Sequence, residues 1–452
     1  MNTLRNSFRE ILRYPSAIAG LVAVLLLVGV AVYAMIAIPY NKAIDLWRGG
    51  EENWYANPRF APPAWINYFR SQKLPVSFHV KSVDGALEKV VTQGSQDTAT
   101  EKFTYSFDFE ADSYPQELMV YFNTSYQEKL PFASITLVTP DGRSIRVADT
   151  ALGHQQNIRF SQQDRVINRY GGGQQQFVMR GLFSDPKTDP LVPLKGTYKL
   201  EITGTTFEAG SNIDADFVFH GQVFGLAGTD MYRRDLMVAL LWGTPIALAF
   251  GLVASLVISI LTLVIAAIGA WYGGWVDETI QRFTEINMVL PFLPILIMIG
   301  TFFKNGRSIW TILGVTIALS IFGGGIKAMR ATFLQLRESM YIEAARAYGA
   351  SNWRIIFQYM IPRMVPLLIP QLVGGVAGFV FLEATLAVLG LGDPTLPTWG
   401  KIINDAESNG ALYNGYYYWI LEPSVLLMFT GLGFALLGFA LDRIFNPRLR
   451  GM

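Results

Sequence analysis

Long stretches without a charged residue constrain this chain more than any other feature of its sequence. Six of them occupy residues 16–38, 236–276, 286–303, 308–326, 364–382 and 423–441. A helix needs about 20 apolar residues to cross the roughly 30 Å of hydrocarbon in a bilayer. We therefore expect an α-helical membrane protein with six spanning helices. The longest run should hold one span near residues 240–268, and the first is too long for the apolar part of a cleaved signal peptide.

The charged residues gather between the first two of these runs. Residues 40–230 carry 18 Lys or Arg and 22 Asp or Glu, whereas the other 261 residues carry only 31 charges. The whole chain is 16% charged, below the roughly 25% of a soluble domain. This distribution indicates a water-soluble block set into a membrane protein. The net charge of +1 argues against a nucleic-acid partner, and the absence of cysteine excludes disulfides and zinc–thiolate sites.

The short loops show a bias in Lys and Arg that predicts the orientation. With the N-terminus inside, 13 basic residues fall in inner segments and 5 in short outer segments. Because basic loops stay in the cytoplasm, we expect a multi-pass protein of the cell membrane with both termini cytoplasmic and residues 39–235 extracytoplasmic. The expected parts are a cytoplasmic N-terminus (1–15), a first span (16–38), an outer linker (39–65), a soluble domain (66–224) and a five-helix membrane core (225–452).

Alternating apolar and polar residues predict β structure in the soluble block. The expected strands are 76–83, 102–109, 117–124, 133–139, 144–147, 197–203 and 216–224, with turn residues between them. Seven or eight such strands suggest an antiparallel sandwich. The three histidines of the chain, His79, His154 and His220, all lie here, but their wide spacing is a weak pattern for a metal site. We expect a binding or spacer module without catalytic residues, bound cofactor or metal.

The segment 327–363, between the fourth and fifth runs, is too long for a simple connector. Residues 339–348 favour a helix, Gly349 suits the position just after it, and Ser351 suits the N-cap of a second helix that Pro362 ends or kinks. One face of the first helix should carry Tyr341, Ala344, Ala345 and Tyr348, while Glu343 and Arg346 are spaced to pair. Composition alone favours an amphipathic helix on the bilayer surface; the alternative is a narrow ridge that fits a groove in another protein.

The same segment carries a family resemblance. Glu343-Ala344-Ala345-x3-Gly349-x9-Tyr359-x-Ile361-Pro362 resembles the EAA signature of ATP-binding-cassette (ABC) importer permeases, with Tyr359 and Ile361 as mild departures. Further segments resemble the dipeptide/oligopeptide/nickel permeases, specifically their C-type (second) subunit. They are Gly228-Thr229-Asp230-x3-Arg234-Asp235, Gly273-Gly274-Trp275-Val276-Asp277, Leu389-Gly390-Leu391-Gly392 with Thr398-Trp399-Gly400, and Asn446-Pro447-Arg448-Leu449. The resemblance covers residues 1–64 and 225–452, and Arg233 departs from it where the family usually has glycine.

The resemblance implies a type I importer permease fold with the β block as a large extracytoplasmic insertion. It also implies a B-type partner permease, two cytoplasmic ATPase subunits that bind ATP and Mg, and an extracytoplasmic solute-binding protein. No P-loop motif occurs in this chain, so hydrolysis is expected in the ATPases. The implied coupling residues are Tyr341, Glu343, Ala344, Ala345, Tyr348, Gly349 and Ala350, and the implied outer-loop motif is Asp230, Arg234 and Asp235. The expected function is import of oligopeptides or related solutes; the alternative is a membrane-anchored receptor or adhesion protein.

Polar and small residues within the runs suggest how the helices pack. Glu383 is the one acid in a span core, and we expect it to make a structural hydrogen bond rather than to contact solute. A small-residue stripe (Ala247, Gly251, Ser255, Ser259) and the pair Gly374 and Gly378 permit close helix approach. They fit packing within the chain and packing against another subunit equally well. Pro291 and Pro294 interrupt the third run and either line the path or kink the helix.

Overall fold

The computed structural model describes residues 14–85, 87–94, 98–302 and 308–445, and every structural statement below concerns these residues. The expected C-terminal motif at 446–449 and most of the expected N-terminal segment lie outside them. The chain divides into a helical unit, Met1–Arg48 with Val238–Met452, and a β unit, Gly49–Met237. The expected domain limits at 66 and 224 therefore fall inside the β unit, which also takes in flanking segments on both sides.

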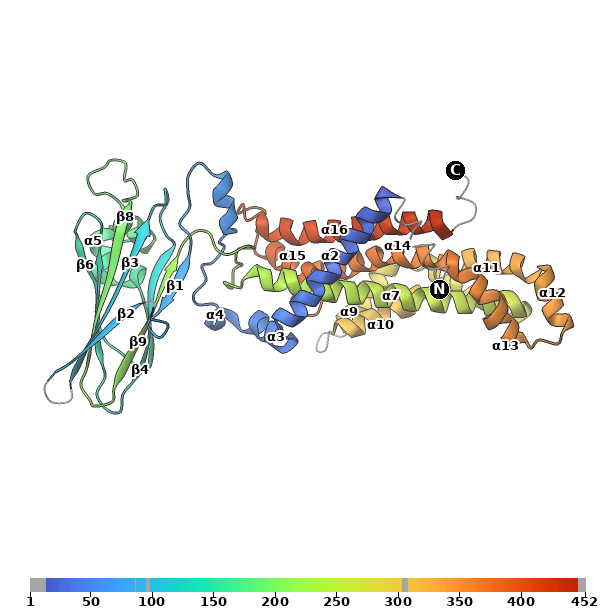
Figure 1. Ribbon diagram of the computed structural model, residues 1–452, viewed down its shortest axis with the longest axis horizontal. Coiled ribbons are helices and arrows are strands. Elements are labelled where there is room, and N and C mark those ends of the chain that lie inside the picture. The colour runs from blue at the N-terminus through green and yellow to red at the C-terminus, as the bar shows by residue number, and fades with distance from the viewer. Residues whose placement is uncertain (1–13, 86, 95–97, 303–307, 446–452) are drawn as a thin grey trace. The chain divides into compact units, whose positions relative to one another are not determined.

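The helical unit contains four helices that are long and apolar enough to cross a membrane. They are α2 (Pro15–Ala37), α7 (Leu236–Tyr272), a continuous helix over Asn352–Val388 that includes α14 (Ile361–Val388), and α16 (Tyr418–Phe445) (Figure 1). Two further pairs qualify only when each is taken together: α8 (Gly274–Val289) with α9 (Phe292–Phe302), bent by 84°, and α10 (Ile309–Ser320) with α11 (Gly324–Arg337), bent by 47°. The expected count of six holds if each bent pair is one span. The expectation of a single helix in the longest run is confirmed.

Proline chemistry explains the sharper bend. Leu290 takes an extended conformation (φ −70°, ψ 131°) directly before Pro291, because the proline ring clashes with a preceding residue in the α conformation. Pro294 lies inside the first turn of α9, where a missing N–H is tolerated. Of the two roles considered for these prolines, bending the helix applies to Pro291, which separates α8 from α9.

Small residues bring the long helices together within the chain. A Cβ at Gly251 of α7 would lie 2.9 Å from the carbonyl oxygen of Val376 on α14. Ser255 Oγ donates to the carbonyl oxygen of Leu372 at 2.6 Å. On α16, a Cβ at Gly438 would lie 3.4 Å from the backbone nitrogen of Gly374. The stripe on α7 thus packs within the chain, whereas the Cβ directions of Gly374 and Gly378 themselves point into open space among the described atoms.

The remaining short helices of the two units complete the element order. In the helical unit they are α3 (Tyr40–Arg48), α12 (Met340–Ala347), α13 (Asn352–Arg354), the π-helical turn η4 (Ile355–Met360) and α15 (Trp399–Ser408). In the β unit they are α4 (Gly50–Asn53), η1 (Ala64–Phe69), η2 (Phe160–Gln162), α5 (Asp164–Tyr170), η3 (Gln175–Phe177) and α6 (Val178–Phe183).

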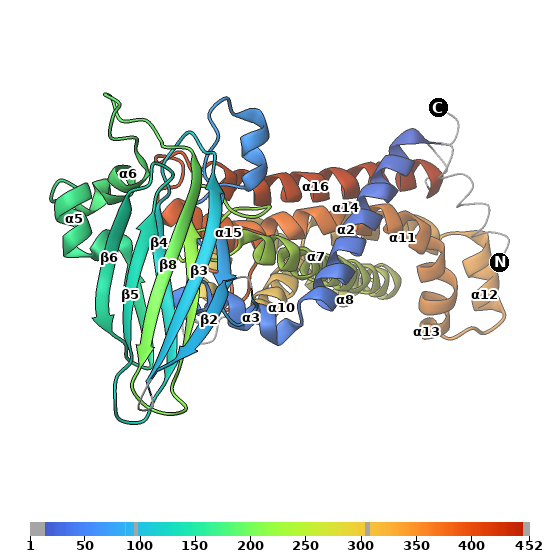
Figure 2. The same cartoon turned by 60° about the vertical axis from the view of Figure 1, so that its left-hand side comes forward.

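The β unit is an antiparallel sandwich, as expected. One sheet has the order β1-β9-β4-β7 and the other β2-β3-β8-β5-β6 (Figure 2). The strands are β1 (Phe78–Lys81), β2 (Glu88–Gln93), β3 (Ala99–Phe109), β4 (Glu117–Ser125), β5 (Phe132–Val138), β6 (Ser144–Ala151), β7 (Gln155–Arg159), β8 (Gly196–Thr206) and β9 (Asn212–His220). Seven of them match the expected strands. Sequence analysis missed β2 and β7, because each is an edge strand whose polar composition carries little alternation.

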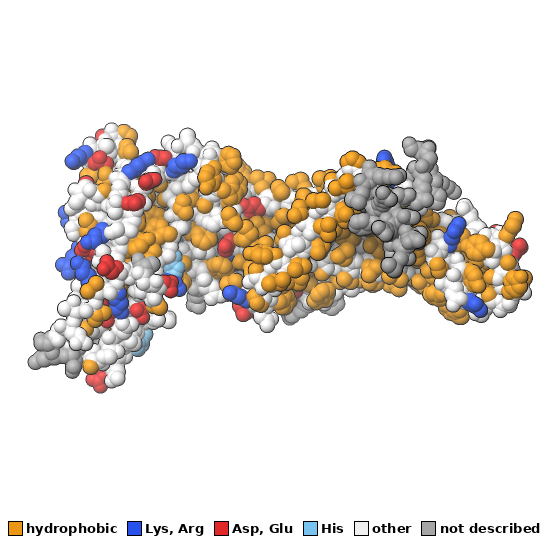
Figure 3. Space-filling view, in the orientation of Figure 1, with side chains coloured by type: hydrophobic (Ala, Val, Ile, Leu, Met, Phe, Trp, Pro, Cys, Tyr) orange, Lys and Arg blue, Asp and Glu red, His pale blue; other side chains and the backbone are white. Residues whose placement is uncertain are grey.

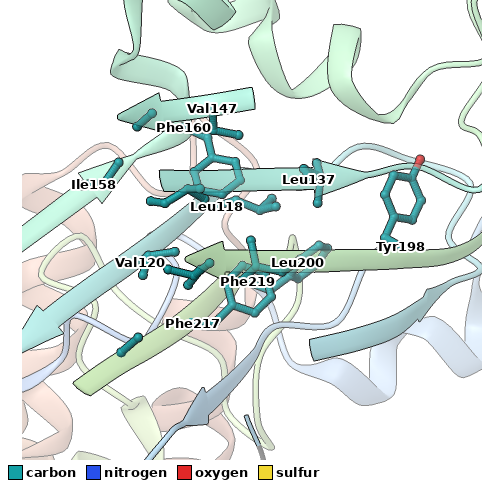
Figure 4. Close-up of a cluster of buried hydrophobic side chains, with 14 of the residues drawn as sticks. Leu118, Val120, Leu137, Val147, Ile158, Phe160, Tyr198, Leu200, Phe217 and Phe219 are labelled. Carbon is teal, nitrogen blue, oxygen red and sulfur yellow. The ribbon is translucent and has the colours of Figure 1, made fainter. Parts of the chain in front are cut away.

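One apolar core lies between the two sheets. Leu118, Val120, Phe217 and Phe219 from one sheet meet Leu137, Tyr198 and Leu200 from the other (Figure 4). The helices α5 and α6 add Val166, Val178, Leu182 and Phe183 to the same cluster. Burying each such side chain contributes about 1.5–3 kcal/mol. Surface chemistry differs between the units: hydrophobic side chains cover the helices, and charged side chains gather over the strands (Figure 3).

Candidate functional site

The segment expected to couple to an ATPase folds at the end of the helical unit opposite α15 (Figures 1 and 2). Its first helix, α12, ends in a Schellman motif. Gly349 has φ +75°, its N–H donates to the carbonyl oxygen of Arg346 (2.9 Å), and the Ala350 N–H donates to that of Ala345 (3.0 Å). This left-handed position favours glycine, so the expectation for Gly349 is confirmed and the turn after α12 is fixed.

The second helix of the segment differs from expectation. Ser351 caps it by accepting a hydrogen bond from the Arg354 N–H (3.4 Å), as expected. The helix does not end at Pro362, however, but continues through η4 into α14 as far as Val388. The π-helical turn precedes Pro362, which lies in the first turn of α14, where proline is tolerated. The expectation of a short second helix is therefore wrong: it forms the start of a long spanning helix.

Only part of the expected face of α12 points outward. Tyr341, Ala344 and Tyr348 are exposed, Tyr348 to 92%. Ala345 is buried beside Ile342 in a cluster with Ile355 and Ile356. The expectation that Ala345 shares the outer face is wrong, because the chain folds back after Gly349 and covers that side of the helix. We call Tyr341, Ala344 and Tyr348 the α12 outer face; Glu343 is also exposed.

Three contacts tie this segment to the ends of α7 and α8. The Arg346 guanidinium lies over the Trp271 ring, 4.4 Å from its centroid, a cation–π arrangement. Arg337 Nη1 donates to the carbonyl oxygen of Ala270 at 3.0 Å. Arg330 donates two hydrogen bonds to the Asp277 carboxylate, and the Nε–Oδ1 distance is 2.6 Å. The bidentate pair fixes both side chains, so these contacts link α11 and α12 to the ends of α7 and α8.

The Asp277–Arg330 pair shows what sequence reasoning missed. Asp277 belongs to one of the segments that resemble the family, whereas Arg330 contributes to the sequence pattern only as one of the basic residues of an inner loop. The two residues are 53 positions apart, and no local pattern links them. Their opposite charges, each beside an apolar run, were the one available signal.

Glu383 lies at a junction of three helices. It is buried on α14 and is hydrogen-bonded by Thr398, whose hydroxyl also accepts from the Lys401 N–H at the start of α15. The next residue, Trp399, is buried and donates through Nε1 to the carbonyl oxygen of Leu240 on α7 (2.9 Å). The contact with Thr398 joins α14 to α15, and the structural role of Glu383 stays a prediction.

We expect Glu383→Gln to keep this junction and Glu383→Leu to weaken it. The amide still accepts the Thr398 hydrogen bond, whereas leucine leaves the O–H donor of Thr398 without an acceptor at a cost of about 1–3 kcal/mol. The thermal unfolding midpoint of the purified chain measures the difference. If Glu383→Gln abolished solute uptake without moving that midpoint, a solute-contacting role would replace the structural one.

The outer-loop motif lies within the β unit, at a neck formed by two segments far apart in sequence. Thr229 and Ala61 exchange backbone and side-chain hydrogen bonds, and Thr229 Oγ1 also donates to the carbonyl oxygen of Pro58. Ala64 N–H donates to the carbonyl oxygen of Gly225 at 2.9 Å. The chain therefore enters and leaves the sandwich at adjacent points.

The charged residues of the motif stabilise the neck. Asp230 is fully buried, and Arg234 Nε donates to its Oδ2 at 2.5 Å while backbone N–H groups of Tyr232 and Arg234 donate to Oδ1. Burial raises the pKa of Asp230 and Arg234 opposes that rise. Asp235 Oδ1 accepts the Met237 N–H (2.9 Å) at the start of α7, and burial raises its pKa too. Each of the three charged residues thus has a hydrogen-bond partner within this segment.

Arg233 stands where the family usually has glycine, and its backbone keeps the conformation that glycine favours. Its φ is +64°, a left-handed conformation in which glycine is favoured. The strained backbone is held by side-chain contacts: Nη1 donates to the carbonyl oxygen of Asn57 (2.6 Å) and lies 3.3 Å from His220 Nδ1. Burial and the Arg233 charge lower the pKa of His220 to about 3, so this imidazole is neutral at physiological pH.

The three histidines do not converge. His220 is at the neck, His79 Nε2 lies 3.6 Å from Asp216 Oδ2, and His154 stacks on Tyr126 with ring centroids 4.3 Å apart. Among residues 14–85, 87–94, 98–302 and 308–445, no group of three or more His, Cys, Asp or Glu side chains is arranged to hold a metal ion.

Comparison with known proteins gives consistent matches. The family model described as "Binding-protein-dependent transport system inner membrane component" matches residues 259–451. A putative peptide transport system permease protein of Brucella suis is 31% identical over 227 residues, 50% of this chain and 74% of the relative. A glutathione transport system permease protein of Pectobacterium atrosepticum is 29% identical over 226 residues, 49% and 72% of the two chains. A peptidoglycan transport system permease protein of Agrobacterium fabrum is 32% identical over 183 residues, 40% and 47%.

Proposed function

Because this chain belongs to the family of binding-protein-dependent transport system inner membrane components, the permease subunits of ABC importers, we propose that it forms a translocation path for oligopeptides or related solutes. The names of its relatives, which include peptide and glutathione transport permeases, support this solute class. A membrane-anchored receptor or adhesion protein is not favoured, since the family match covers the helical unit from residue 259 onward.

We further propose its partners: a B-type permease, two ATPases that bind ATP and Mg, and an extracytoplasmic solute-binding protein. The α12 outer face carries this proposal. It is exposed, small at Ala344, and flanked by Tyr341 and Tyr348, so it suits a narrow groove. The ties to Trp271, Ala270 and Asp277 offer a rigid route from that face to the spanning helices. The chain itself is proposed to bind no cofactor and to catalyse no reaction.

Co-purification tests the proposed assembly. An affinity-tagged form of the full chain should retain an ATPase subunit through mild detergent extraction, and the reconstituted complex should hydrolyse ATP faster when solute-loaded binding protein is added. Recovery of the chain without any ATPase, under conditions where a known importer retains its own, would contradict the proposal.

The proposed topology places both termini in the cytoplasm, residues 39–235 outside, and one span in each bent helix pair. Ser144 on β6 is exposed, and Glu338 between α11 and α12 is exposed. In this cysteine-free chain, Ser144→Cys should react with a membrane-impermeant maleimide from outside intact cells or spheroplasts, and Glu338→Cys should react only after permeabilisation. The opposite labelling pattern would reverse the orientation argued from loop charges.

A further inference from the structure

The outward face of the four-stranded sheet in the β unit carries several polar side chains and both charge signs. Side chains alternate between the two faces of a strand; Val120, Phe122 and Ile158 point into the core, and their neighbours point outward. The strand register places Asn157 beside Tyr121 and Tyr121 beside Asp216. The adjacent outward positions on β7 and β4 hold Arg159, Gln155 and Asn123. One row of the sheet thus combines an amide, an aromatic ring and a carboxylate.

This face is hollowed into a cleft of about 790 Å³ that lies entirely within the β unit. Tyr55 closes one side of it: its ring lies 4.3 Å from that of Tyr121, and its hydroxyl donates to Asp216 Oδ2 at 2.9 Å. Asn123, Gln155 and Asn157 line it as well. Among the described residues, no hydrogen bond involves the side-chain amides of these three. The cleft therefore offers unused donors and acceptors beside an aromatic surface.

Three charged side chains line the cleft, of which Arg159 and Asp216 lie on different strands and Arg233 contacts Asn57 and His220. The Arg159 guanidinium is half-buried and donates no hydrogen bond to another described residue. Although burial opposes it, the nearby His79 and the hydrogen bond from Tyr55 lower the pKa of Asp216, so this carboxylate is ionised at neutral pH; its Oδ1 accepts no hydrogen bond within the described chain. Two strand spacings of about 4.8 Å and two residues of about 3.4 Å put the two Cα atoms about 12 Å apart.

We propose that this cleft binds a short peptide with free termini. The peptide carboxylate pairs with Arg159, whose guanidinium matches carboxylate geometry, and the peptide ammonium lies toward Asp216. A chain of three extended residues spans about 10 Å, which fits the separation of the two charges once side-chain reach is included. The amide side chains meet the peptide N–H and C=O groups, and Tyr55 and Tyr121 contact its side chains.

The charge arrangement favours a peptide over a neutral sugar. An oligosaccharide would use the tyrosine rings and the amides but has no group that requires an ionised arginine and an ionised aspartate. The Arg159 charge also acts on the Glu117 carboxylate of the neighbouring strand, but no described carboxylate accepts a hydrogen bond from its guanidinium. An anionic ligand group is therefore the occupant that best uses these donors. This inference does not rest on transport, because the site is complete in one unit of this chain.

Titration of the purified full-length chain in nanodiscs, without ATPases, tests the proposal. Tri-alanine should bind, whereas C-terminally amidated tri-alanine and N-acetylated tri-alanine should each bind at least tenfold more weakly. Arg159→Gln should reduce tri-alanine affinity at least tenfold and abolish the discrimination against the amide, and Arg159→Lys should restore part of it. The matched control is Arg146→Gln, which changes an exposed arginine on β6 of the other sheet and should leave binding unchanged.

Several results would overturn the proposal. Equal affinity for the acid and the amide would remove Arg159 from the site, as would unchanged binding by Arg159→Gln. Maltotriose binding that competes with tri-alanine would show a sugar site instead. Because the two modified peptides are tested on the unaltered chain, the proposal stays testable even if an Arg159 variant folds poorly. Loss of ATPase coupling with peptide binding intact would contradict the proposed importer alone.

Discussion

Substitution of Ala344 by tryptophan should abolish solute-stimulated ATP hydrolysis by the reconstituted complex while leaving the chain folded. Ala344 is exposed on the α12 outer face between Tyr341 and Tyr348, and a groove shaped for alanine cannot admit an indole. Overpacking costs about 1–3 kcal/mol and occasionally more, which corresponds to a roughly 5- to 150-fold weaker docking equilibrium. The measurement is ATPase activity with and without solute-loaded binding protein, in proteoliposomes.

Two comparisons make this test specific. Ala331→Trp places the same ring at an exposed alanine of the preceding helix, α11, and should leave the stimulation largely intact. Ala345→Trp is unsuitable, because Ala345 is buried against the chain's own core and the substitution would disturb the fold directly. Wild-type stimulation in Ala344→Trp would remove the α12 outer face from the coupling interface.

A second large effect is expected at Gly400, where even one methyl group cannot be accommodated. A Cβ there would lie 2.6 Å from the carbonyl oxygen of Ala384 and 2.6 Å from the Cβ of Ala387, both on α14. Backbone atoms must shift to relieve such contacts, and this would pull α15 away from α14 and strain the Thr398 and Trp399 hydrogen bonds. We expect Gly400→Ala to cost about 1–3 kcal/mol or more and to lower the thermal midpoint of the purified chain clearly.

The matched control is Gly314→Ala on α10. No described atom lies within 4 Å of the Cβ position at Gly314, and alanine favours a helix over glycine by about 1 kcal/mol. This variant should unfold at the same temperature as the unaltered chain or slightly above it. If Gly400→Ala behaved like Gly314→Ala, the close packing between α15 and α14 would be absent from the folded protein.

The membrane-spanning segments were readable from sequence because a bilayer excludes charge from any stretch that crosses it. The run at 236–276 predicted one long helix, and α7 has those bounds within a few residues. The bends within the third and fourth runs were less visible. Proline marked the break at Leu290, but the break at residues 321–323 is marked only by glycines, Gly323 followed by Gly324 and Gly325, and glycines are common in spanning helices.

In the β unit, too, some strands could be predicted from the sequence and others could not. Alternation predicted the strands that have one face in the core, such as β4 and β5, because burial on one side imposes a period of two. The edge strands β2 and β7 have little buried surface, so their sequences carried no such signal. The candidate peptide cleft was invisible for a further reason: Arg159, Tyr121 and Asp216 come from three strands, and only strand pairing brings them together.

In the coupling segment, the sequence by itself determined the turn that follows α12. Gly349 and Ser351 set the turn because a left-handed residue and a side-chain cap act over three or four positions. Only the tertiary structure decided which side of α12 is available to a partner and which residues hold it. Ala345 became buried and Arg330 met Asp277 because segments distant along the chain pack together, and the free energy of such contacts has no counterpart in local spacing.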